Sequence, residues 1–330
     1  METLLFHLQQ IGWIRTSTAR CTPLTGGVSC DILLIEEEGR RFVLKQALAK
    51  LRVKADWFAD VERNHFEQAY LSVVGEIVPG KVPKVLHADR ERGFFLMEYL
   101  GEGWENWKNR LLCGRTNAPE AALAGESLGV IHSRTWGDPR LASEFNTTEN
   151  FIKLRIDPYL RTTGQKHPSL CSFFEQEATR LEQTTQALVH GDFSPKNLLL
   201  QPDGLMILDC EVAWFGDPLF DVAFFLNHLL LKAWLLPEHA EGFDLMARAF
   251  LNSYRTAMGS KFGAIEEKQA VRLLLMLMLA RIDGKSPVEY FTENVVAQCR
   301  IRDFVSQHLP DPPPSLNALL MLLKQLRHSL

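Results

Sequence analysis

The sequence predicts a two-lobed α+β protein, with a β-rich N-terminal lobe over residues 1–100 and a mainly helical C-terminal lobe over residues 101–330. Two observations support this fold class. The chain has 330 residues, which is too long for one small core. Strand-like segments are concentrated before residue 100, whereas from Asp221 onward apolar residues recur with helical spacing.

The N-terminal lobe is predicted to contain two hairpins separated by one helix. Each hairpin has two short apolar runs flanking a turn-prone segment, which is Glu37-Glu38-Gly39-Arg40 in the first and Arg90-Glu91-Arg92-Gly93 in the second. The intervening segment has apolar residues near one helical face. The expected strands cover residues 32–36, 41–46, 82–87 and 94–99, and the expected helix covers residues 56–74.

The C-terminal lobe is predicted to be helical apart from one further hairpin. Two apolar runs at 198–200 and 205–208 flank Gln201-Pro202-Asp203-Gly204, whose residue types favour turns. A proline-rich break at 310–314 precedes a last helix from Ser315. The other expected helices cover residues 119–135 and 172–184 and the segment that begins at Asp221.

Composition restricts the compartment and the partners. A hydrophobic fraction of 46% is ordinary for a globular protein, and a net charge of -4 gives no general attraction to nucleic acid. Six cysteines without a C-x-x-C pair favour a reducing compartment. The N-terminus has no signal-peptide pattern, and the apolar run at 273–280 is too short to cross a bilayer. We expect a cytoplasmic protein with no nucleic-acid or membrane partner, and its oligomeric state stays open.

One loop has the residues that phosphoryl transfer needs. In Leu188-Val189-His190-Gly191-Asp192-Phe193-Ser194-Pro195-Lys196-Asn197-Leu198-Leu199, Asp192 and Asn197 lie between apolar runs, and the following hairpin brings Asp209 back toward Asn197. Mg²⁺ prefers oxygen ligands such as those of Asn197 and Asp209. Asp192 is then available to accept the proton of an attacking hydroxyl. The H-x-D-x-x-x-x-N spacing matches the catalytic loop of protein kinases.

Three elements in this order resemble the aminoglycoside phosphotransferase and choline kinase group: His190-Gly191-Asp192 through Asn197, then Asp209-x-Glu211, then Gly216-Asp217-Pro218-x-x-Asp221. The resemblance covers most of the chain. It implies a protein kinase-like fold, ATP and Mg²⁺ as cofactors, and a small-molecule hydroxyl as the acceptor. It also implies that Glu211 joins the metal ligands and that His190 braces the loop. Asp221 is expected to cap the next helix and to bind the loop.

The resemblance also locates a nucleotide site in the N-terminal lobe. A phosphate-binding loop is implied at Gly26, Gly27 and Ser29, because glycines let backbone amides approach phosphate oxygens. Cys30, which follows Ser29, departs from the Ser-Asn ending that is common in this group. A plain glycine turn is the alternative interpretation.

Lys45, at the end of a predicted strand, is implied as the ligand of the α- and β-phosphates. Such a buried lysine needs a carboxylate partner, and Glu67 on the next helix fits the Glu-x-x-x-Leu pattern. A solvated helix face is the alternative for Glu67. The segment Glu98-Tyr99-Leu100 resembles the hinge that contacts adenine.

The acceptor is the least determined part. Trp104 and Trp107 are candidates for a sugar or amine site, with linker packing as the alternative. Arg281 and Asp283, at the end of an apolar helix, are further candidates, although a basic residue there also favours the helix dipole. The Asp-x-Glu form at Asp209 resembles the methylthioribose and choline kinase branches, which implies a sugar or amino alcohol.

Three alternatives remain open at this point. The chain can instead be an aminoglycoside-modifying phosphotransferase, although the positive charge of Arg281 weighs against a polycationic substrate. It can be a catalytically inactive nucleotide-binding module of the same fold. A metal hydrolase using His190, Asp192 and Asp209 is the third possibility, and it predicts phosphate release without a nucleotide.

Overall fold

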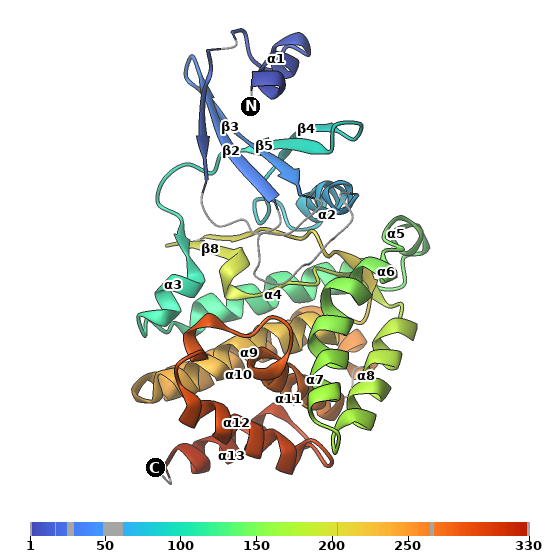
Figure 1. Ribbon diagram of the computed structural model, residues 1–330, viewed down its shortest axis with the longest axis vertical. Helices are drawn as coiled ribbons and strands as arrows, with labels where there is room; N and C mark the ends of the chain where they lie inside the picture. The colour runs from blue at the N-terminus through green and yellow to red at the C-terminus, as the bar shows by residue number, and fades with distance from the viewer. Residues whose placement is uncertain are drawn as a thin grey trace.

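The computed structural model describes residues 2–16, 18–24, 30–48, 62–202, 204–264 and 267–328. The predicted fold class is confirmed, because a sheet-rich N-terminal region stands on a mainly helical remainder (Figure 1). Helix α1 lies at one end of the long axis and α13 at the other (Figure 1).

The N-terminal region has a five-stranded sheet in the order β1-β2-β3-β5-β4, with antiparallel neighbours. Both predicted hairpins are present. The first closes at Glu38 and Gly39, whose φ angles of 44° and 81° are those that a tight hairpin turn requires. The elements are α1 (Glu2–Gln10), β1 (Arg20–Pro23), β2 (Cys30–Glu37), β3 (Arg40–Ala47), α2 (Arg63–Ile77), β4 (Val85–Asp89) and β5 (Phe94–Glu98).

The helix predicted over 56–74 corresponds to α2, and its first residues lie outside the described part of the chain. Helix α1 was not predicted. Leu8 of α1 and the following Ile14 pack in a small core with Ile35 and Phe42 of the sheet. This core is separate from the larger core that fills the helical region.

The helical region contains short two- and three-stranded sheets beside its helices. The predicted hairpin at 198–208 is present as β8 and β9, with Leu198 opposite Ile207. The elements up to the hairpin are β6 (Glu105–Asn106), α3 (Trp107–Leu112), α4 (Ala118–Thr135), α5 (Pro139–Glu144), α6 (Thr148–Phe151), η1 (Ile152–Arg161), α7 (Thr162–Lys166), α8 (Cys171–Gln183), β7 (Ala187–Val189), η2 (Pro195–Asn197), β8 (Leu198–Gln201) and β9 (Gly204–Ile207). The rest are β10 (Trp214–Gly216), α9 (Leu219–Leu235), η3 (Pro237–His239), α10 (Ala240–Met258), η4 (Gly259–Ala264), α11 (Glu267–Asp283), η5 (Glu289–Phe291), α12 (Val295–His308) and α13 (Leu316–His328).

Helix α9 forms the centre of this region, and its residues are buried on every face as far as Trp234. It begins at Leu219, so Asp221 lies in its first turn and the expected N-cap role is wrong. Asp217 takes that role in part, since its Oδ1 accepts a hydrogen bond from the Leu219 amide at 2.8 Å. A helix that is apolar all round must be covered by other helices.

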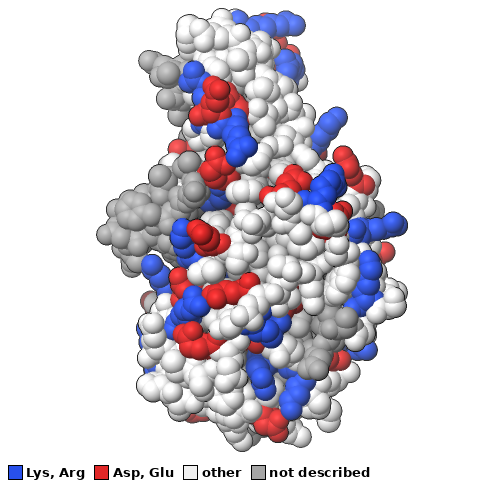
Figure 2. Space-filling model, turned by 90° about the vertical axis from the view of Figure 1, so that its right-hand side faces the viewer, with Lys and Arg blue, Asp and Glu red and all other residues white. Residues whose placement is uncertain are grey.

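Element η1 was also not predicted. It is a π-helix that contains Pro158, a residue that a sequence pattern does not place inside a helix. Within the described residues, no individual helix is both long and apolar enough to cross a bilayer, and α9 with the segment Pro237–Gly263 meets that test only as a pair bent by 120°. Figure 2 shows one face on which basic and acidic side chains are interspersed.

Candidate active site

The loop 190–197 starts at the end of β7, and Asp221 of α9 holds its first turn. Asp221 Oδ2 accepts a hydrogen bond from the His190 amide at 2.7 Å, and Oδ1 accepts one from the Gly191 amide at 2.9 Å. The expected tie between Asp221 and this loop is therefore present. Gly191 has a φ of 76°, and a Cβ there would lie 2.4 Å from the Val212 carbonyl oxygen, so no larger residue fits.

His190 is fully buried and bonded through both ring nitrogens. Nε2 lies 3.0 Å from the Leu208 carbonyl oxygen, and Nδ1 accepts a hydrogen bond from the Asp192 amide at 3.1 Å. These partners assign the single ring proton to Nε2. Burial lowers the pKa of His190, which keeps the ring neutral. A neutral ring that joins the loop to β9 is a brace, as the sequence suggested.

Asp192, the predicted base, has two basic neighbours. Its Oδ2 lies 2.8 Å from Lys196 Nζ and 3.1 Å from Arg155 Nη2. Burial acts to raise the pKa of Asp192, but the charges of Lys196 and Arg155 outweigh it and hold the pKa below its ordinary value. Asp192 is therefore ionised at neutral pH.

Sequence reasoning missed both of these basic residues. Lys196 lies four residues after Asp192, and that spacing is a signal that was available in the sequence. Arg155 comes from η1, whose Arg155 Nε also donates to the Gly191 carbonyl oxygen at 2.5 Å. No local pattern around Arg155 marks it, because its partners lie 36 residues or more further along the chain.

Asn197 and Asp209 lie together through the β8–β9 hairpin. The Leu208 amide donates to the Asn197 carbonyl oxygen at 2.9 Å, which closes the hairpin beside the loop. Asn197 Nδ2 donates to the Asp192 carbonyl oxygen at 3.0 Å, so its Oδ1 is the atom left for a ligand. Asp209 has a φ of 62°, an uncommon backbone conformation for a residue with a side chain.

Both residues line a cavity of about 240 Å³ between the sheet and the helical region. Its lining combines apolar side chains such as Ile32 and Met97 with the polar groups of Lys45, Asn197 and Asp209. No group of three or more His, Cys, Asp or Glu side chains that could hold a metal occurs in the described part of the chain. An amide oxygen and a carboxylate nevertheless fit Mg²⁺, which completes its shell with water and substrate phosphates.

Lys45 of β3 connects the two halves of this cavity. Its Nζ lies 2.7 Å from Glu67 Oε1 on α2 and 2.6 Å from Asp209 Oδ1, so the expected pair with Glu67 is present. Burial raises the pKa of Glu67 to about 7. Burial acts to lower the pKa of Lys45, but Asp209 and Glu67 outweigh it and keep that pKa well above its ordinary value. Lys45 is therefore charged at neutral pH.

Glu211 forms its contacts with Arg63 and Cys30, not with the other predicted metal ligands. Its Oε2 lies 2.9 Å from Arg63 Nε and accepts a hydrogen bond from the Cys30 thiol at 3.5 Å. Glu211 is not among the residues that line the cavity. The predicted phosphate-binding residues Gly26, Gly27 and Ser29 lie outside the described residues.

The predicted hinge follows directly after Met97, which lines the cavity. The Glu98 amide donates to the Lys84 carbonyl oxygen at 3.0 Å, and Glu98 Oε1 accepts from the Lys84 amide at 2.9 Å. The ring of Tyr99 lies 4.8 Å from the Arg41 guanidinium. Leu100 is half-buried.

The predicted substrate residues do not come together. Trp107 is wholly buried with its ring 5.4 Å from that of Phe225, so it is a core side chain, and the prediction of a substrate contact is corrected. Trp104 is half-buried. Asp283 is bound by Arg302 and His167 at 2.8 Å each, which ties α11 to α12 and α7 instead. Arg281 is buried near Tyr159 and is considered below.

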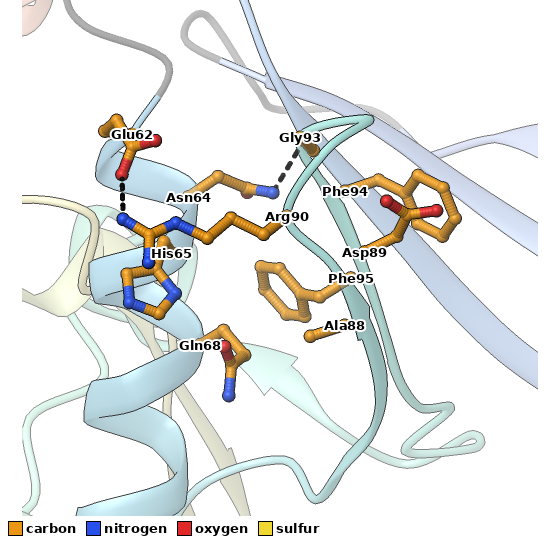
Figure 3. Close-up of a pocket in the computed structure, with 10 residues that line it drawn as sticks. All are labelled: Glu62, Asn64, His65, Gln68, Ala88, Asp89, Arg90, Gly93, Phe94 and Phe95. Carbon is orange, nitrogen blue, oxygen red and sulfur yellow. Dashed lines mark hydrogen bonds and ion pairs between the residues drawn. The ribbon is translucent and has the colours of Figure 1, made fainter.

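A second, smaller cavity of about 40 Å³ lies between α2 and the β4–β5 hairpin (Figure 3). Its polar groups are partnered across it, because Arg90 Nη2 lies 2.9 Å from Glu62 Oε2 and Asn64 Nδ2 donates to the Gly93 carbonyl oxygen at 2.8 Å (Figure 3). None of the predicted site residues lines it. The cavity at Lys45 and Asp209 is therefore the candidate site.

Comparison with known proteins identifies the family of this chain. Residues 20–256 match the profile of a family described as the phosphotransferase enzyme family. Methylthioribose kinase 1 of Oryza sativa subsp. japonica is 23% identical over 279 residues, which is 70% of this chain and 63% of that protein. The chain therefore spans less than two thirds of the length of that relative.

Two solved structures share the fold. The choline kinase of Cryptosporidium parvum has a TM-score of 0.59 at 11% identity, with 97% of this chain and 99% of that chain covered. An amicoumacin kinase in complex with AMP-PNP, Ca²⁺ and Ami has a TM-score of 0.53 at 14% identity, with 91% of each chain covered. At these identities the likeness establishes the fold alone.

Proposed function

The chain belongs to the phosphotransferase enzyme family, and from this premise we propose that it transfers the γ-phosphate of ATP to a hydroxyl of a small metabolite. The observation that carries the proposal is the convergence of Lys45, Asn197 and Asp209 on one cavity, with Asp192 bonded to its edge through Lys196 and Asn197. Residues 1–100 would hold the nucleotide, and residues 101–330 would hold the acceptor.

Asp192 is the proposed base. It orients the acceptor hydroxyl and takes its proton as the oxygen–phosphorus bond forms and ADP leaves. Its lowered pKa makes it a weak base. Its main contribution is therefore to hold the hydroxyl in line with the phosphate, because phosphoryl transfer depends chiefly on positioning and charge stabilisation.

Asn197 Oδ1 and the carboxylate of Asp209 are the proposed metal ligands. A bound Mg²⁺ would supply charge neutralisation for the phosphate oxygens. Lys45 is proposed to contact the α- and β-phosphates, with Glu67 fixing its position. The apolar Ile32 and Met97 suit the adenine ring, with Glu98 to Leu100 as its proposed hinge contacts.

The proposed acceptor is a sugar or an amino alcohol. The support comes from the similarity to a protein named methylthioribose kinase and from the Asp-x-Glu form at Asp209. The burial of Trp107 leaves Trp104 as the tryptophan that remains a candidate for this sugar or amine site.

Mg²⁺-dependent ADP release, measured over a panel of sugars, amino alcohols, amino acids and aminoglycosides, tests the proposal. Asp192→Ala is expected to lower kcat by about 10² to 10⁴, while ATP binding measured by calorimetry persists. Asp303→Ala, an exposed position on α12, is the control and should match the wild type. Acceptor-dependent ADP release that survives unchanged in Asp192→Ala would contradict the assignment of the base.

A further inference from the structure

One face of α9 carries polar side chains in an otherwise apolar helix. Phe224, His228 and Lys232 are spaced four residues apart and lie on the same side. His228 is 6% exposed and Lys232 is 1% exposed. His228 Nε2 has no hydrogen-bond partner among the described residues. Within the described part of the chain, Lys232 Nζ donates only to the His228 carbonyl oxygen, at 3.2 Å, and it lies 5.1 Å from the ring of Tyr290.

Arg281, at the end of α11, lies beside this face of α9, because its guanidinium packs on the ring of Tyr159, which lies 5.8 Å from the ring of Phe224. Its Nη1 donates to Tyr159 Oη at 3.0 Å and to Ser286 Oγ at 3.1 Å. Its Nε is buried and has no partner among the described residues. The Nε side of a guanidinium is one of the edges that bind a carboxylate through two parallel hydrogen bonds. We call His228, Lys232 and Arg281 the basic cluster.

The negative charge of Glu289 acts on both Lys232 and Arg281 of the basic cluster without pairing with either. Neither Lys232 nor Arg281 has a carboxylate within ion-pair distance in the described part of the chain, and the nearby Glu289 pairs with Lys108. Burial, followed by the charge of Lys108, lowers the pKa of Lys232 to about 7. Buried basic side chains without an ion-pair partner are costly, and proteins generally pair such groups.

The basic cluster is connected to the proposed base through one aromatic ring. Arg281 lies 5.5 Å from the centre of the Tyr159 ring, and Arg155 lies 5.7 Å from the same ring. Arg155 Nη2 in turn lies 3.1 Å from Asp192 Oδ2. A ring and a guanidinium therefore separate the cluster from Asp192.

Resting on the proposed function and narrowing its sugar class, we propose that the phosphate acceptor is a sugar acid, whose carboxylate binds the basic cluster of His228, Lys232 and Arg281 while a distal hydroxyl meets Asp192. The carboxylate would receive hydrogen bonds from the Nε side of Arg281 and from Lys232. His228, as a neutral ring, can donate one more from Nε2. The acceptor would thus bear the opposite charge to choline or an aminoglycoside.

Matched acceptor pairs test this proposal: ribonate with ribose, gluconate with glucose, and glycerate with glycerol, plus choline and ribose 5-phosphate. ADP release should favour the acid in each pair. Arg281→Met should lower kcat/KM for the acid by about 100-fold more than for the neutral partner, because removing one member of a buried charge pair acts on binding of the charged group. Arg281→Lys should recover part of the loss, and Arg134→Met, exposed on α4, should have no effect.

A thermal shift without ATP separates this proposal from the proposed function. Ribonate or gluconate should raise the Tm of the wild type and of Asp192→Ala, but not that of Arg281→Met or Lys232→Met. ADP release with choline, a neutral sugar or ribose 5-phosphate in preference to every acid would overturn the acid proposal and leave the kinase proposal standing. An absence of acceptor-dependent ADP release would count against the kinase proposal, and the acid proposal then stands or falls on the Arg281-dependent thermal shift.

Discussion

Arg155 and Lys196 approach the same oxygen of Asp192 from different directions, one from η1 and one from the loop itself. Lys196 is half-exposed and lies only four residues from Asp192 on the same loop. Its side chain can therefore follow a movement of the Asp192 carboxylate. Arg155 is buried, and its fork spans Asp192 and the Gly191 carbonyl oxygen. Arg155 is therefore the residue that fixes where the carboxylate points.

Replacement of Arg155 by methionine is expected to lower kcat by roughly 10- to 100-fold with little change in KM for ATP, because a small displacement of the base disturbs the in-line geometry. Steady-state kinetics measure this. Arg155→Lys should recover only part of the loss, since lysine cannot hold both oxygens. Arg161→Met is the matched control on η1, where Arg161 pairs with Asp157 and Glu182 instead. Equal effects of the two methionine variants would refute the positioning role of Arg155.

At the scale of elements, the packing of the helical region depends on the close approach of α4 and α10. A Cβ at Gly125 would lie 2.1 Å from the Phe250 carbonyl oxygen, and one at Gly129 would lie 2.7 Å from the Tyr254 carbonyl oxygen. Both obstacles are backbone atoms, which cannot rotate away. This contact also positions Tyr254, whose hydroxyl lies 3.0 Å from Nδ1 of His132, the neighbour of Asp221.

Gly125→Ala should therefore destabilise the fold by about 1–3 kcal/mol, the usual cost of overpacking, despite the better helix propensity of alanine. Urea unfolding measures the difference. Gly75→Ala on α2 is the matched control, because a Cβ there would make only an ordinary contact with Val82 at 3.5 Å. We expect Gly75→Ala to be neutral or stabilising by about 0.5–1 kcal/mol. A Gly125 variant as stable as the Gly75 variant would contradict the close approach.

At the scale of the whole molecule, two buried lysines, Lys45 and Lys232, lie between packed elements and differ in their ion-pair partners. Lys45 is compensated by Glu67 and Asp209 across the cavity between the sheet and the helical region. Lys232 in the basic cluster has no ion-pair partner in the described structure. Burial and the charge of Lys108 lower the pKa of Lys232 to about 7, so the folded protein binds fewer protons there than the unfolded chain above that pH.

This difference predicts how global stability varies with pH. Between about pH 7 and the ordinary lysine pKa, Lys232 is protonated in the unfolded chain but largely neutral in the folded protein. Lys232 therefore makes a contribution to the free energy of unfolding that rises with pH in this window, by at most about 1.4 kcal/mol per pH unit. Lys232→Met removes that contribution. The stability of the wild type relative to Lys232→Met, from urea unfolding between pH 7 and 10, should therefore rise with pH. Lys268→Met, at a half-exposed residue of α11, should give no such trend. A difference for Lys232→Met that is independent of pH would refute the lowered pKa.

The sequence by itself determined the fold class, most hairpins and helices, and the candidate loop, because periodicity, turn residues and motif spacing are local properties. Asp192, Asn197 and Asp209 could be named from such patterns, and the Lys45–Glu67 pair from the resemblance to a family of kinases. Only the tertiary structure decided which side chains are buried and which charges face one another. It moved Trp107 into the core, bonded Glu211 to Arg63, and brought Arg155 to Asp192 and Arg281 to α9. These outcomes depend on packing between segments far apart in the chain, for which no local pattern exists.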